Sequence, residues 1–203
     1  MLLLCDSDDS HPTHRSHAMI LTLSEKDYLN TLLKDESGRA LYQINTPSTI
    51  FGGRTTITRL IGQMDHEIAW IAWNSFTPDE FHQHGRTVEA SERFPRKGFF
   101  RTRRVLLASD GQSYVWKDGR GGVKVNRTAA PPCPAAHPSS ESIQLDRADA
   151  EHSRVAKYHT RSLGFFSKSH PAYLEVAADG VPILDDIVAS FVYVEKKRQQ
   201  HKD

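Results

Sequence analysis

Hydrophobic residues in this 203-residue chain form short runs over most of its length and one dense block near the C-terminus. The short runs are rich in β-branched and aromatic residues, and turn-forming residues separate them, which is typical of strands in an all-β domain. We predict strands at 18–23, in both arms of a hairpin over 31–44, and at 54–61, 67–76, 105–109, 113–117, 122–127, 142–146, 153–160 and 172–177.

The dense block, residues 187–194, is apolar apart from Ser190. Pro182 and the acids Asp185 and Asp186 precede it, and a basic run follows it, which predicts a helix whose end charges complement its dipole. We therefore expect the two acids to favour the helix start, not acid/base chemistry. A membrane-spanning helix needs about 20 apolar residues. This shorter helix, apolar on every side, is expected inside the protein, and no transmembrane segment is predicted.

About a dozen strands and one buried helix predict a mainly β fold. A strongly twisted sheet of that size tends to close on itself or split into two layers. We predict a closed antiparallel barrel of about twelve strands around a central hydrophobic C-terminal helix. The alternative is a β-sandwich in which the helix caps one open end.

The chain length suits one domain, which we assign to residues 18–198. Residues 1–17 are polar without periodicity and are predicted to be a disordered tail. A Pro, Ala and Ser rich stretch at 128–142 predicts a flexible loop, and 199–203 form a polar tail.

The chain carries a formal charge of +1 and 38% hydrophobic residues, so any electrostatic function must come from a local patch, and nucleic acid is not an expected partner. Cys5 and Cys133 both lie in segments without predicted structure, which argues against a stabilising disulfide. The N-terminus lacks the features of a secretory signal. We expect an intracellular, cytoplasmic protein.

The segment RFPRKGFFRTRR, residues 93–104, is the clearest chemical feature because it contains six cations and no acid. Such a segment, interleaved with phenylalanines, is what an anionic lipid surface would require. The alternative interpretation is a solvated strand edge with the phenylalanines in the core. The candidate lipid-binding residues are Arg93, Arg96, Lys97, Arg101, Arg103 and Arg104.

Other candidate chemistry is weak. Trp70 and Trp73 are three residues apart, so on a strand their side chains lie on opposite faces and one of them must point outward. That tryptophan is either covered by a loop or exposed at a lipid or protein interface. His82 and His84 share a face, but no further ligand for a zinc site is defined, and His159 is expected to be a hydrogen-bonded structural residue. No catalytic motif is present, so we predict no enzyme activity, no cofactor and no metal.

Several segments resemble, in order, a fungal protein family of unknown function, notably LYQINTP (41–47), RFPRKGFF (93–100), VAKYH (155–159) and ILDDIVASFVYVEKKR (183–198). That family is similar to the tubby C-terminal-like superfamily, which includes LURP-one-related proteins and phospholipid scramblases. The resemblance covers about residues 30–198 and implies a twelve-stranded barrel around a hydrophobic C-terminal helix. Tubby-type domains are associated with phosphoinositide binding, but none of their lipid-contacting residues carries over to a position here.

These observations predict a non-enzymatic binding module that docks peripherally on anionic phospholipid, phosphoinositide included, through the basic segment. The alternative is a protein-interaction or scaffold domain with an unknown partner and no lipid role.

Overall fold

The structure is a computed structural model that describes residues 18–48, 52–62, 64–98, 103–118, 142–148, 153–162 and 169–201. Several predicted features lie outside the described residues: the N-terminal tail, the strand at 122–127, most of the Pro-rich stretch, both cysteines and Arg101.

Within the described residues, thirteen strands form one antiparallel sheet in the order β7-β6-β5-β4-β3-β2-β1-β13-β12-β11-β10-β9-β8. The strands are β1 (Met19–Leu23), β2 (Thr31–Lys34), β3 (Ala40–Asn45), β4 (Gly53–Ile61), β5 (Met64–Trp73), β6 (Glu80–Gln83), β7 (Arg86–Glu89), β8 (Arg96–Lys97), β9 (Arg103–Leu107), β10 (Ser113–Asp118), β11 (Ser142–Arg147), β12 (Arg154–His159) and β13 (Tyr173–Val176). The helical segments are α1 (Ala90–Arg93), the 3-10 turn η2 (Ala178–Ile183) and α2 (Leu184–Gln199).

The β2–β3 hairpin shows how the local sequence specifies an element. Tyr42 and Ile44 are buried while Gln43 between them is exposed, which is the alternation of a strand with one face in the core. The turn has Gly38 at φ +83, a conformation that glycine adopts without steric cost. Asp35 Oδ1 accepts hydrogen bonds from the amides of Ser37 and Arg39. The predicted hairpin is confirmed.

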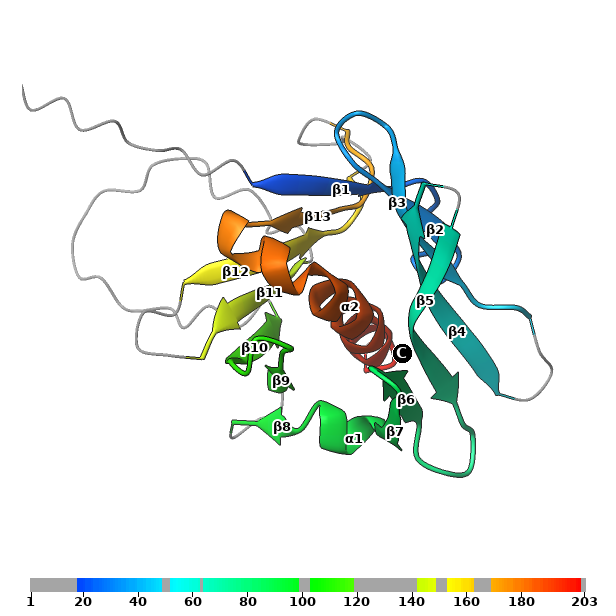
Figure 1. Ribbon diagram of the computed structural model, residues 1–203. Coiled ribbons are helices and arrows are strands. Elements are labelled where there is room, and N and C mark those ends of the chain that lie inside the picture. The colour runs from blue at the N-terminus through cyan, green and yellow to red at the C-terminus, as the bar shows by residue number, and fades with distance from the viewer. Residues whose placement is uncertain are drawn as a thin grey trace, which may run out of the picture.

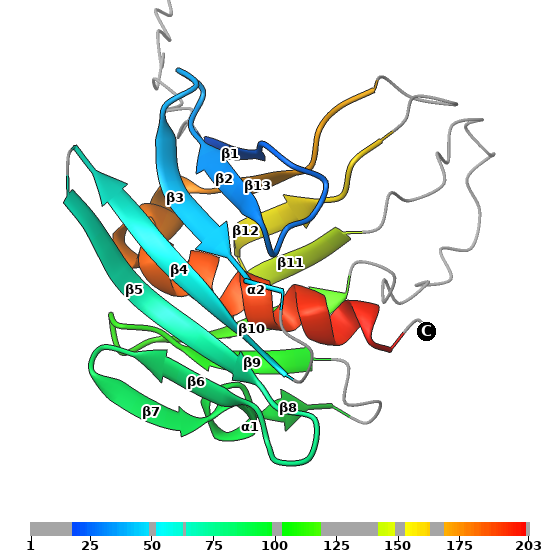
Figure 2. The same cartoon turned by 90° about the vertical axis from the view of Figure 1, so that its right-hand side faces the viewer.

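Helix α2 lies on the concave side of the curled sheet (Figures 1 and 2), and eleven of its sixteen residues are buried. Strands far apart in the sheet contact it. Phe191 packs on Tyr158 of β12, with ring centroids 4.6 Å apart, and Tyr193 stacks on Trp73 of β5 at a centroid distance of 6.0 Å. The predicted burial of the C-terminal helix is therefore confirmed.

The prediction of a closed barrel is wrong. The sheet ends at β7 and β8, and among the described residues these two strands do not pair. The chain turns out of the sheet at α1 between them, and β8 is only two residues long. Pro95, which has no amide hydrogen for a ladder, precedes β8. The result is one open sheet that curls around α2, and α2 does not cap an end as the sandwich alternative required. We call the gap between β7 and β9 the seam.

Candidate functional site

The exposed cations of the basic segment gather where β8 and β9 meet the C-terminal end of α2. Antiparallel pairing sets Arg96 opposite Arg104 and Lys97 opposite Arg103. Arg96 Nη2 lies 3.1 Å from His201 Nε2, which ties this ribbon to the residues after α2. We call this surface, made by Arg96, Lys97, Arg103 and residues 196–201, the basic end.

Two of the predicted lipid-binding residues point into the protein. Arg104 is 7% exposed, its Nη1 donates to the carbonyl of Phe94, and its guanidinium lies 5.0 Å from the ring centroid of Tyr193. Burial lowers the pKa of Arg104 and that of Arg93. Arg93 Nη1 donates a 2.6 Å hydrogen bond to the carbonyl of Leu107, across the seam. These two side chains therefore contact other parts of the protein and are not presented to a membrane surface.

Arg96, Lys97 and Arg103 are exposed. Within the described part of the chain, none of the three forms an ion pair with an acid. Because their charges are not neutralised by a neighbour, they remain available for an anionic partner. The ribbon therefore presents three of the six predicted cations, while Arg101 lies outside the described residues.

An exposed aromatic residue lies next to the basic end. Phe76, in the loop between β5 and β6, is 97% exposed. The backbone amide of Asn74 donates a 3.1 Å hydrogen bond to Asp79 Oδ1, which closes the loop. Asp79 also pairs with Lys197 of α2 at 2.6 Å. The sequence interpretation placed Phe76 at the end of a strand. Its neighbours Ser75, Thr77 and Pro78 were the signal for a loop position.

A cavity of about 440 Å³ lies beneath the basic end. Arg96, Arg104 and Lys197 contribute cations to it, but the acids Asp79 and Glu89 share the same walls. A phosphate entering it would meet those two carboxylates. The exposed ribbon is therefore the stronger surface for anions.

The outward tryptophan is Trp70, and it is covered by side chains instead of a loop. His82 stacks on it at a centroid distance of 5.1 Å, and the Arg54 guanidinium lies 4.3 Å from its ring centroid. Trp73 is buried and stacks on Tyr193 of α2. Trp70 thus offers little free aromatic surface.

The other two histidines considered in the sequence, His84 and His159, have structural contacts. His159 Nε2 lies 3.0 Å from Glu175 Oε2, and its ring stacks on Tyr173 at 4.3 Å. Burial lowers the pKa of His159, so the neutral ring is favoured. His84 Nε2 lies 3.5 Å from Asp186 Oδ1. Among the residues that the structure describes, no three metal-ligating side chains cluster, and no helix is long and apolar enough to cross a membrane.

Asp185 and Asp186 lie in the first turn of α2, as predicted, and also cross-link the fold. Asp185 accepts a 2.5 Å hydrogen bond from the Tyr42 hydroxyl and pairs with Arg59 at 3.1 Å. Burial and this hydrogen bond raise the pKa of Tyr42. Asp186 is buried and its Oδ2 accepts a 2.9 Å hydrogen bond from the Ser109 amide.

Comparison with protein families gives a match over residues 26–200 to DUF6593, a family of unknown function, and the chain belongs to that family. Neither the comparison with curated proteins nor that with solved structures found a match.

Proposed function

We propose that this member of the DUF6593 family is a non-enzymatic module that docks peripherally on intracellular membranes containing anionic phospholipid, phosphoinositides among them. One observation carries the proposal: three exposed cations without acid partners among the described residues gather on the β8–β9 ribbon, and an almost fully exposed phenylalanine lies in the loop that Asp79 ties to Lys197 of the basic end. Cations attract lipid head groups, and an aromatic ring inserts favourably at the membrane interface. The resemblance to tubby-like domains, which are associated with phosphoinositide binding, also supports lipid as the partner.

The expected affinity follows from the charges. Each cation near an anionic membrane contributes about 1 kcal/mol, so Arg96, Lys97 and Arg103 together contribute about 3 kcal/mol at moderate salt. Insertion of the Phe76 ring adds about 2 kcal/mol if its surface leaves water. Such a module binds reversibly. Arg101, also a cation of this segment, lies outside the described residues and stays a prediction from the sequence.

The test is sedimentation with vesicles. The full chain is mixed with neutral phosphatidylcholine vesicles or with vesicles that also contain phosphoinositide, at low and at high salt. We expect binding only to the anionic vesicles, and weaker binding at high salt because the Debye length falls from about 10 Å at 0.1 M to about 3 Å at 1 M.

The variant Lys97→Glu/Arg103→Glu reverses two exposed charges that face each other across β8 and β9. It avoids the buried Arg104, whose replacement would disturb the core. Loss of two cations should weaken binding by at least about 30-fold. The matched control is Arg154→Glu/Arg161→Glu, which makes the same charge change at exposed positions away from the basic end. Equal binding by both variants, or no binding by the wild-type chain, would refute the proposal.

A protein-interaction role is the second candidate, and the tip of the β4–β5 hairpin favours it. Ile61 and Met64 are exposed there at 53% and 75%. Apolar side chains at a hairpin tip fit a protein partner whose binding persists at high salt. In this case, binding of a protein partner should persist at high salt. Ile61→Asp/Met64→Asp should abolish that binding, and Lys97→Glu/Arg103→Glu should leave it intact. This result would establish protein interaction in place of lipid docking.

A further inference from the structure

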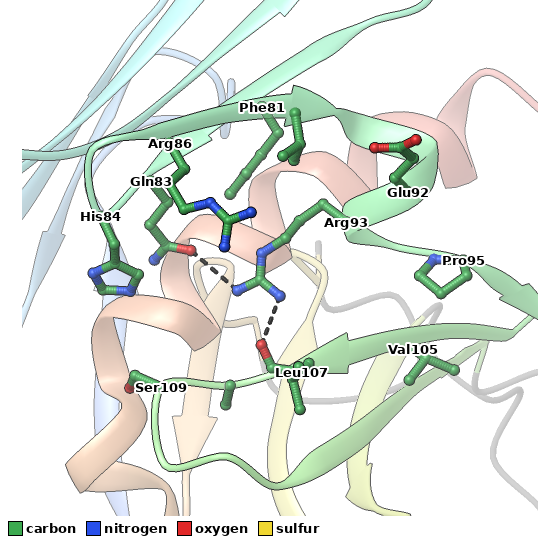
Figure 3. A pocket seen from close by; sticks show the side chains of 12 residues that line it. Phe81, Gln83, His84, Arg86, Glu92, Arg93, Pro95, Val105, Leu107 and Ser109 are labelled. Atoms are coloured by element: carbon green, nitrogen blue, oxygen red, sulfur yellow. Dashed lines mark hydrogen bonds between the residues drawn. The ribbon is translucent and has the colours of Figure 1, made fainter.

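A cavity of about 560 Å³ opens in the seam (Figure 3). Its apolar walls come from both sides of the gap: Phe81 and Val88 from β6 and β7, Pro95 from the connection after α1, and Val105 and Leu107 from β9. Leu107 is 56% exposed, so one lip of the cavity presents apolar surface to water. The size lies within the range of about 300–1,000 Å³ that is typical of small-molecule sites.

The polar side of the cavity is organised by Arg93. Its Nη1 donates to the carbonyl of Leu107 on one side of the seam, and its Nη2 donates to Gln83 Oε1 at 3.3 Å on the other (Figure 3). The guanidinium therefore spans the gap that β-sheet hydrogen bonds would bridge in a closed barrel. It also fixes the orientation of the Gln83 amide, because an acceptor oxygen must face the guanidinium.

Gln83 is left with an unused donor. Its side chain is 5% exposed and lines the cavity, and its Nε2 has no hydrogen-bond partner among the described residues. Rotating the amide would not remedy this, since it would turn the amide hydrogens toward the cationic Arg93. A buried amide nitrogen without an acceptor is uncommon in folded proteins. An oxygen atom of a ligand in the cavity would supply the missing acceptor.

The charges around the cavity balance. Asp186 lies behind the wall, with Oδ1 3.5 Å from Arg93 Nη2, and neutralises that guanidinium. Arg86 and Glu92, both exposed, also line the cavity with opposite charges. An anionic ligand would gain no net attraction there and would lose its hydration. The complementary ligand is therefore uncharged.

We propose that the seam cavity binds an uncharged small molecule whose apolar body lies between β7 and β9 and whose carbonyl-type oxygen accepts a hydrogen bond from Gln83 Nε2. This site is separate from the exposed cations of the basic end, so it goes beyond the lipid-docking function and does not depend on it.

Three probes of one ring size test the proposal: benzamide, which carries a neutral acceptor, benzoate, which carries a charge, and toluene, which carries neither. Each is titrated into the ¹⁵N-labelled full chain. We expect benzamide to shift the Gln83 side-chain amide and the backbone amides of Val88 and Leu107. It should bind about tenfold more tightly than benzoate or toluene, because one hydrogen bond made in a buried site is worth about that factor.

Two variants separate the polar contact from the apolar space. Gln83→Leu removes the free donor and offers no new acceptor to the benzamide NH₂ group, so it should abolish the preference for benzamide over toluene. Val88→Trp fills the cavity from its wall without altering Gln83 and should prevent binding of all three probes. Val181→Trp, at an exposed position in η2, is the matched control and should bind like the wild-type chain.

Thermal unfolding first establishes that each variant is folded. Benzamide shifts that are absent up to its solubility limit, or that persist unchanged in folded Val88→Trp, would overturn the proposal. Equal affinities for benzamide, benzoate and toluene would show that the cavity is only an apolar cleft and that Gln83 selects nothing, which would also overturn it.

Discussion

Replacement of Phe191 by alanine should be among the most destabilising single changes in the chain. Phe191 lies in the middle of α2, has 0% exposure, and packs against the rings of Tyr28 and Tyr158 at centroid distances of 6.2 and 4.6 Å. A phenylalanine-to-alanine change in such a core costs about 3–5 kcal/mol, since it loses both the transfer of the ring from water and its packing contacts. A domain of this kind is stable by about 5–15 kcal/mol, so the loss is a large share of the total.

Urea unfolding followed by tryptophan fluorescence measures this loss. With an m-value of about 2 kcal/mol per molar urea, the midpoint should fall by about 2 M. Phe76→Ala removes the same ring from a 97% exposed position and should leave the midpoint within about 0.3 M. A fall of less than about 0.5 M for Phe191→Ala would refute the placement of α2 as the centre of the core.

Three further predictions concern the same contacts. A Cβ at Gly180 would come within 2.8 Å of Val176 Cγ1, so Gly180→Ala should cost about 1–3 kcal/mol by overpacking, as measured by urea unfolding. Asp186→Asn should lower the free energy of unfolding by about 2 kcal/mol because it leaves the half-buried guanidinium of Arg93 without its acid partner. Asp185→Asn breaks a more exposed pair, with Arg59, and should cost about 1 kcal/mol or less. Similar urea midpoints for the two variants would contradict this. Burial lowers the folded pKa of His159 below 6.5, so the unfolded chain binds that proton more readily, and stability should fall as the pH drops through about 6.5 and level off below the folded pKa. His159→Gln should flatten that part of the stability profile, and an unchanged profile would show that other groups cause it.

The sequence predicted much of the candidate site as a cluster of cations, but it did not predict which of these cations are exposed and which are buried. The absence of acids between 93 and 104 predicted an anion-binding surface, whereas Arg103 and Arg104, as neighbours on a strand, must face opposite sides. Which of them faces inward depends on the position of Tyr193, far along the chain. Phe76 was missed because its strand was drawn too long, and the seam cavity was missed because the predicted barrel had no gap.

The sequence by itself determined features that depend on neighbouring residues: most of the strands, the β2–β3 turn, and a C-terminal helix too apolar to face water and too short to cross a membrane. Local periodicity is sufficient for these, because a side chain's direction repeats with the backbone. The short strands β6, β7 and β8 were not predicted. Only the tertiary structure decided that the sheet stays open, that Arg93 spans the seam, and that Gln83 is buried with an unused donor. Each of these depends on segments distant in sequence, whose pairing and burial no local pattern specifies.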